Sequence, residues 1–143
     1  MISSILKGKG TEVTSVAPGD TVLATARVLT ERRIGAALVR DADGALLGII
    51  SERDIVRGMA QQGQGTTQLP VEKLMTRDLV TVTPHMSVAE AMGLMTRRRI
   101  RHLPVLEGGK LVGLVSIGDL VKARIDEAEH EAAELKAYVV SAG

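Results

Sequence analysis

A seven-residue pattern occurs twice in this chain and constrains its fold more than any other feature. It runs from Gly48 to Asp54 and again from Gly113 to Asp119, and both copies consist of Gly, two aliphatic residues, Ser, two variable residues and Asp. Each copy includes the end of an apolar run typical of a buried strand and leads into a predicted helix that begins near the Ser. We therefore expect the same strand-to-helix junction in two places.

The repetition extends over most of the chain. Aligning Val16 with Val82 places the Arg-Arg-Ile sequence at 32–34 on the identical sequence at 98–100. One repeat of roughly 50 residues could bury only a marginal core, whereas 143 residues that are 45% hydrophobic are enough for a compact domain. The chain is therefore predicted to contain two copies of one unit.

Each copy is predicted to form a β-α-β-β-α unit, which gives an α/β (α+β) fold. Strands are expected at 12–16, 35–39, 46–50, 79–82, 102–106 and 111–115, and helices at 22–32, 52–61, 70–74, 87–98 and from 117 onward. Residues 1–10 are expected to form a short amphipathic turn, and the polar, Gly-rich stretch 61–68 a linker. The short turns at 41–44 and 107–109 favour antiparallel hairpins over a parallel doubly wound sheet.

Composition and charge exclude several classes of function. The formal net charge is +1, so no overall field would attract nucleic acid or an anionic membrane. The chain has no cysteine, which excludes disulfides and thiol chemistry. No apolar run approaches the roughly 20 residues that span a bilayer, and residues 1–10 do not resemble a signal peptide. We therefore expect a cytoplasmic protein with no membrane partner.

The repeated Ser and Asp permit two interpretations. A carboxylate in the first turn of a helix can accept both hydroxyls of a ribose, and the Ser with the free N–H groups of the helix start suits a phosphate. Alternatively, Ser51 and Ser116 are helix caps, while Asp54 and Asp119 stabilise the positive end of the helix dipole. The two interpretations are compatible with one another.

A β-α-β-β-α unit that ends in G-x-x-S-x-x-D and occurs twice in tandem resembles the cystathionine-β-synthase (CBS) domain pair. The resemblance covers about residues 16–122 and implies two repeats packed with pseudo-twofold symmetry around two clefts. In this family the clefts commonly take adenosine-containing ligands such as AMP, ADP, ATP, S-adenosylmethionine or NAD. The expected division is an N-terminal linker at 1–15, a first repeat at 16–61, a linker at 62–81, a second repeat at 82–124 and a C-terminal helical extension at 125–143.

The resemblance also implies which residues contact the ligands. One cleft would use Ser116, Asp119, Arg101 and His102 from the second repeat, Ile34, Gly35 and Ala36 from the first, and Lys9, Gly10 and Thr14 from the N-terminal linker. The other would use Ser51, Arg53, Asp54, Gly35, Ala36, the linker residues Met75, Thr76 and Val80, and Ile100. The cationic residues are distributed unequally, so we expect the cleft of Asp119 to bind a phosphate-bearing ligand better.

Other side-chain clusters give weaker predictions. The run Arg97 to Arg99, with Arg101 and His102, could form an RNA-binding patch, but cations also suit the C-terminal end of a helix, so a nucleic-acid partner is not expected. His85 and His130 lack partners at ligand spacing, and no nucleophile occurs with a base and an orienting group. We therefore expect neither a metal requirement nor an enzyme.

The last predicted helix carries an apolar stripe with the spacing of a coiled coil. Its members are Val121, Ile125, Ala128, Ala132, Leu135 and Val139. The stripe fits either packing on the chain's own domain or pairing with a second copy, and we expect a homodimer. The sequence as a whole predicts a regulatory module that senses an adenine nucleotide and acts on an unknown protein target. The rival prediction is a protein-interaction scaffold whose clefts are vestigial.

Overall fold

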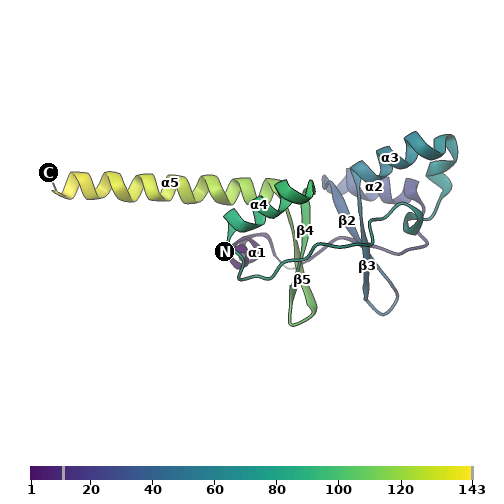
Figure 1. Cartoon of the computed structure of the whole chain (residues 1–143), viewed down its shortest axis with the longest axis horizontal. Coiled ribbons are helices and arrows are strands. Elements are labelled where there is room, and N and C mark those ends of the chain that lie inside the picture. The colour runs from purple at the N-terminus through teal and green to yellow at the C-terminus, as the bar shows by residue number, and fades with distance from the viewer. Residues whose placement is uncertain (11, 143) are drawn as a thin grey trace. The chain divides into compact units, whose positions relative to one another are not determined.

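The computed structural model of the protein describes residues 1–10 and 12–142, which form two compact units. One unit contains residues 12–80. The other combines the N-terminal segment up to residue 10 with residues 81–142, so it is built from two pieces that lie far apart in the sequence (Figure 1). Each unit is described by itself below.

The unit of residues 12–80 is a small mixed sheet with helices. Its elements are β1 (Ser15–Val16), α2 (Val22–Arg32), β2 (Ala36–Arg40), β3 (Leu46–Ser51), α3 (Glu52–Gln62) and the 3₁₀ turns η1 (Gly63–Gln68) and η2 (Val71–Lys73). β1 runs parallel to β2, and β2 pairs antiparallel with β3 in a hairpin. The order in the sheet is β1-β2-β3.

The core of this unit joins the sheet to α2 and to the segment around η2. It consists of Val16, Val22, Leu29, Ala37, Val39, Ile50, Val71 and Met75. Val22 and Leu29 are seven residues apart and so lie on one face of α2. The helix begins where the Thr21 side chain accepts a hydrogen bond of 3.1 Å from the backbone N–H of Ala24.

The second unit contains α1 (Ile2–Lys9), α4 (Val88–Arg98), β4 (His102–Glu107), β5 (Lys110–Ser116) and α5 (Ile117–Ala142). β4 and β5 form an antiparallel hairpin. The start of α1 is attached to the loop before α4, because the backbone N–H groups of Ile2 and Ser3 donate to the carbonyls of Met86 and Pro84, both at 2.9 Å. Ile2 and Leu6 are buried, so α1 contributes directly to the core of this unit.

The predicted mixture of helices and strands is confirmed, but several segments differ from the prediction. The helix expected at 70–74 is only the 3₁₀ turn η2, and the strand expected at 12–16 is reduced to the two residues of β1. Residues 1–10, expected as a turn, contain the helix α1. The expected strand at 79–82 is wrong: only Val82 pairs, donating to Pro104 and accepting from Leu106, because the residues before it make no ladder. The expected linker at 61–68 contains η1, where the buried Thr66 hydroxyl bonds the carbonyls of Gly58 and Gly63. Across residues 1–10 and 12–142, none of the helices combines the length and apolar character required to cross a bilayer.

Candidate functional site

Both copies of the repeated motif form the same junction between a strand and a helix. Ser51 ends β3, and its side chain accepts a 3.2 Å hydrogen bond from the N–H of Asp54, while the Asp54 carboxylate accepts one of 3.0 Å from the N–H of Ser51. Ser116 and Asp119 repeat this exchange at 3.1 and 2.9 Å. The capping interpretation of the motif is therefore correct, and each carboxylate is fixed at a helix start.

The two carboxylates nevertheless differ in their remaining partners. The Asp54 side chain is only 8% exposed and lies 3.7 Å from the Arg57 guanidinium. One of its oxygens accepts from both the N–H and the hydroxyl of Ser51, and the other accepts from Thr76 at 3.3 Å. Both oxygens of Asp54 are thus already hydrogen-bonded inside the protein.

Asp119 is more accessible and is paired with a lysine. Its side chain is 25% exposed, and the ammonium of Lys9, at the end of α1, lies 2.6 Å from one of its oxygens. Lys9 also donates to the carbonyl of Leu114 at 2.8 Å. Burial raises the pKa of the Asp119 carboxyl, but hydrogen bonds from Lys9 and Ser116 outweigh this effect, so the pKa lies below its ordinary value. Asp119 is therefore a carboxylate at neutral pH.

His102 lies beside this pair. In the register of the hairpin it is the partner of Ser116, which places this first residue of β4 next to the junction. Burial lowers the pKa of His102 most, the charges of Lys9 and Arg101 lower it further, and the Asp119 carboxylate opposes them. The imidazole is consequently neutral at pH 7 and can both donate and accept a hydrogen bond.

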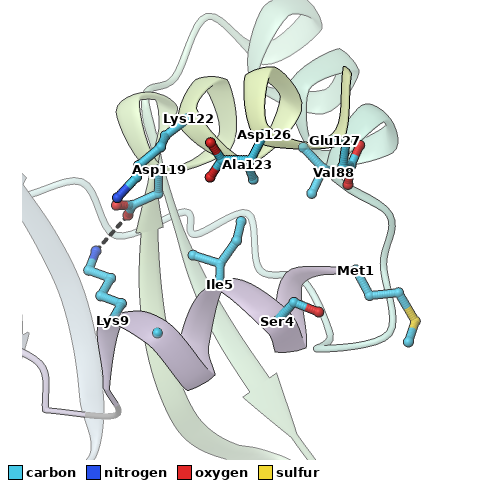
Figure 2. A pocket seen from close by; sticks show the side chains of 11 residues that line it. Met1, Ser4, Ile5, Lys9, Val88, Asp119, Lys122, Ala123, Asp126 and Glu127 are labelled. Carbon is cyan, nitrogen blue, oxygen red and sulfur yellow. Dashed lines mark hydrogen bonds and ion pairs between the residues drawn. The ribbon is translucent and has the colours of Figure 1, made fainter. Parts of the chain in front are cut away.

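A cavity of about 580 Å³ opens beside Asp119, between α1 and α5 (Figure 2). This volume is in the range of sites for small organic ligands. The Lys9–Asp119 ion pair lies at one end, as Figure 2 shows. The other lining residues are Met1, Ser4, Ile5, Gly8, Val88, Lys122, Ala123, Asp126 and Glu127. The lining therefore mixes apolar side chains such as Ile5 and Val88 with charged side chains, most of which belong to α5.

The structure distributes the predicted site residues between the two units. Lys9, Gly10, Ile100, Arg101, His102, Ser116 and Asp119 belong to one unit, and Thr14, Ile34, Gly35, Ala36, Ser51, Arg53, Asp54, Met75, Thr76 and Val80 to the other. Within the unit of α1 and residues 81–142, Lys9, Ser116 and His102 gather around Asp119. Within the unit of residues 12–80, Ser51 and Thr76 gather around Asp54, while Thr14 instead accepts a hydrogen bond from Arg32 at 3.1 Å. That residues of both units contribute to one and the same ligand site stays a prediction.

Most of the residues lining the cavity were missed by the sequence analysis. The signal that could have found them is helical spacing, because Asp119, Lys122 and Asp126 recur on one face of α5, and Ile5 and Lys9 on one face of α1. Nothing in the local sequence indicates that these two faces meet, since they are more than one hundred residues apart. The arginine run has the expected position at a helix end, where Arg97 and Arg98 form the last turn of α4.

Comparisons with known proteins give a consistent result. The CBS domain family matches residues 9–61 and 71–126. The CBS domain-containing protein CBSX3, mitochondrial, of Arabidopsis thaliana is 38% identical over 96% of this chain and 71% of its own. The crystal structure of the CBS-domain containing protein ATU1752 from Agrobacterium tumefaciens has a TM-score of 0.84 at 41% identity, covering 86% of this chain and 92% of the other. The CBS domain pair of protein MJ0100, solved in complex with 5′-methylthioadenosine and S-adenosyl-L-methionine, shares the fold at a TM-score of 0.77 and 23% identity, covering 89% and 97%.

Proposed function

This chain belongs to the CBS domain family, and on that premise we propose that it is a regulatory module that binds an adenosine-containing ligand through Asp119. The carboxylate accepts hydrogen bonds from the two ribose hydroxyls, as an acidic residue does in dinucleotide-binding folds. The ligand class is supported by the MJ0100 CBS domain pair, whose two ligands both contain adenosine.

The observation that carries this proposal is the accessible pair of Lys9 and Asp119 beside a ligand-sized cavity. Lys9 is 40% exposed and flexible, so its ammonium can leave the carboxylate when a ribose arrives and then bind a phosphate of the ligand. His102, the first residue of β4, and Arg101 just before it supply further polar groups close to the junction. Asp54 offers a weaker site because both of its oxygens are already bonded within the protein.

Binding alone is the proposed activity, and catalysis is not part of it. Occupancy of the site would change the shape of the module or its affinity for a protein target, and the module would work as a homodimer in the cytoplasm. AMP, ADP, ATP and NAD are the ligands to compare, because each carries a ribose diol together with at least one phosphate.

Titration calorimetry with these nucleotides tests the ribose assignment. Asp119→Asn keeps the size of the side chain but removes its charge, and a hydrogen bond to a charged group contributes about 1.5 to 3 kcal/mol, so affinity should fall roughly 10- to 100-fold. Asp54→Asn is the matched variant and should have the smaller effect on binding. A 2′-deoxyadenosine nucleotide should bind the wild type more weakly than its ribose counterpart does. The Asp119→Asn variant should bind the two nucleotides with about the same, low affinity.

The proposed contact between Lys9 and the phosphate is tested by comparing ligands with and without a phosphate. Lys9→Met should weaken binding of AMP while leaving adenosine binding nearly unchanged, because the nucleoside has no phosphate for the ammonium. If Asp119→Asn binds AMP as the wild type does, the ribose assignment is wrong.

A protein-interaction scaffold is the second candidate, since Asp119 already has a partner in Lys9 and the pair could serve structure alone. The absence of binding by all four nucleotides at millimolar concentration would favour the scaffold.

A further inference from the structure

Helix α5 continues far beyond the unit in which it begins. It has 26 residues, and its first turns pack into the unit, with Leu120 fully buried and Ala123 and Glu127 half-buried. From residue 128 to residue 142 every side chain is exposed, and Figure 1 shows α5 running on past α1 and α4. A helical segment of about 15 residues is only marginally stable in water without packing. This part of α5 therefore needs a partner to remain helical.

One face of this helix has the pattern of a coiled-coil seam. Val121, Ile125, Ala128, Ala132, Leu135 and Val139 alternate in steps of four and three residues, which are the d and a positions of a heptad. Ile125, Leu135 and Val139 are 52%, 65% and 61% exposed, although they are large and apolar. The a positions are Ile125, Ala132 and Val139, and the last d position is Leu135. β-Branched residues at a with Leu at d favour two parallel strands.

We propose that this face binds the same face of a second copy of the chain, with the two helices parallel and in register. The inference rests on the proposed homodimer and adds the surface and the direction of pairing. The charges that flank the seam support the parallel direction. A residue at g meets the e residue five positions later on the other helix, which pairs Arg124 with Glu129 of the second copy and Glu131 with its Lys136. Both contacts are attractive, and each occurs twice by symmetry.

An antiparallel pair in the register that uses all six residues of the seam would place like charges together. Matching a with d across the pair brings Lys122 near Lys136 of the second copy, and it brings each Glu129 and each Glu131 near its own equivalent. The exposed ion pair within one helix, Arg124 to Glu127 at 3.2 Å, does not oppose the parallel arrangement because such pairs contribute little. The contact of His130 with Glu134 lies away from the seam, at positions f and c.

Disulfide trapping tests the direction directly, because the chain contains no cysteine. Ala128→Cys places a thiol at a d position, where two parallel helices in register bring the same residue within the 4.4–6.8 Å Cα separation that a disulfide needs. We expect this variant to form a covalent dimer under mild oxidation. Ala133→Cys is the matched control, since it changes the same residue type at an exposed position away from the seam, and it should stay monomeric on a denaturing gel.

Each other outcome of the trapping experiment overturns the inference. Crosslinking only when Ala128→Cys is mixed with Ala132→Cys would mean antiparallel helices, and the dimer itself would stand. No crosslink, with a dimer still found by sedimentation, would place the contact elsewhere. A chain that sediments as a monomer at every concentration would remove the proposed dimer as well, whereas nucleotide binding through Asp119 could still be present.

A charge exchange gives an independent measurement with the full-length chain. Lys136→Glu creates two repulsive contacts with Glu131 in the parallel pair, and we expect the dissociation constant of the dimer to rise about 3- to 10-fold at low salt. Adding Glu131→Lys should restore the dissociation constant of the wild type, because a lysine at 131 then faces a glutamate at 136 of the second copy. In an antiparallel pair Lys136→Glu would face Lys122 and tighten the dimer, so a fall in the dissociation constant contradicts the inference.

Discussion

At the scale of single residues, the glycine that opens each repeated motif has a steric role. A Cβ at Gly48 would lie 2.7 Å from the backbone oxygen of Thr76 and 2.8 Å from the sulfur of Met75. A Cβ at Gly113 would lie 2.5 Å from a terminal methyl of Leu6. In both units a segment from elsewhere in the chain crosses the strand at its glycine. The obstacle at Gly48 includes backbone, whereas the obstacle at Gly113 is the end of a flexible side chain.

This difference predicts unequal effects of the same substitution. The Thr76 backbone is paired with Ile49 by hydrogen bonds of 3.0 and 2.8 Å and cannot easily move, so Gly48→Ala should lower the free energy of unfolding by about 1 to 3 kcal/mol. Gly113→Ala should cost less than about 1 kcal/mol, because Leu6 can change rotamer. Urea unfolding followed by circular dichroism compares the two variants. If both variants lose the same free energy of unfolding, the steric obstacle at the glycine does not determine the loss of stability.

His102 predicts a dependence of stability on pH. Its pKa in the folded chain lies below 6.5, so just below pH 6.5 the unfolded chain binds more protons, and the free energy of unfolding falls as pH drops through this window. The Asp119 pKa, lowered from 3.8, adds a further loss only in stronger acid. His102→Gln should therefore lose less stability than the wild type between pH 7.5 and 5.5, measured by urea unfolding at both values. His85→Gln, an exchange at an exposed position, should keep the wild-type dependence.

At the scale of elements, local patterns predicted the helices better than the short strands. The helix expected at 22–32 is α2, because apolar residues at helical spacing and the Thr21 cap agree. The second-repeat counterpart expected at 87–98 is α4, which begins one residue later with Ser87 as its cap. The strand expected at 79–82 has suitable residues, but a strand also requires partners along its length, and only Val82 has them. Burial of Thr66, a tertiary effect, explains the ordered turn within the predicted linker.

The same limit applies to the candidate site. The exchange of hydrogen bonds between Ser116 and Asp119 is local and follows from residues three apart. The position of Lys9 beside Asp119 was expected only from the family resemblance, because no local pattern connects residues 110 positions apart. The cavity beside the pair was not predicted, since it depends on how the faces of α1 and α5 meet.

At the scale of the whole molecule, each unit is completed by a segment outside its own repeat. Leu6 and Lys9 of α1 contact Gly113 and Asp119 in the unit of residues 81–142. Met75 and Thr76 make the equivalent contacts with Gly48 and Asp54 in the unit of residues 12–80. In each unit, the junction between strand and helix is therefore covered by a segment that lies outside the hairpin and its helices. We infer that stability depends on the completing segments as much as on the repeats.

Two substitutions of fully buried residues test this dependence. Ile2→Ala removes a buried side chain of α1 and should destabilise the unit of residues 81–142 by about 2 to 5 kcal/mol, because the cavity it leaves cannot fill completely. Val71→Ala should act in the same way, with a smaller change in volume, on the unit of residues 12–80. Ser4→Ala, at an exposed position of α1, is the control and should change little.

Hydrogen exchange at low urea concentration locates the effect of each substitution. Ile2→Ala should accelerate exchange in β4, β5 and α4 while leaving β2 and β3 protected, and Val71→Ala should give the reverse. The reason is that each side chain is fully buried, and the backbone hydrogen bonds of Ile2 to Met86 and of Val71 to Asp20 place each residue within its own unit. Deleting residues 1–9 should enlarge the effect of Ile2→Ala in the same elements. If both substitutions accelerate exchange equally throughout the chain, the two units unfold together, and the expectation that each segment stabilises only its own unit is wrong.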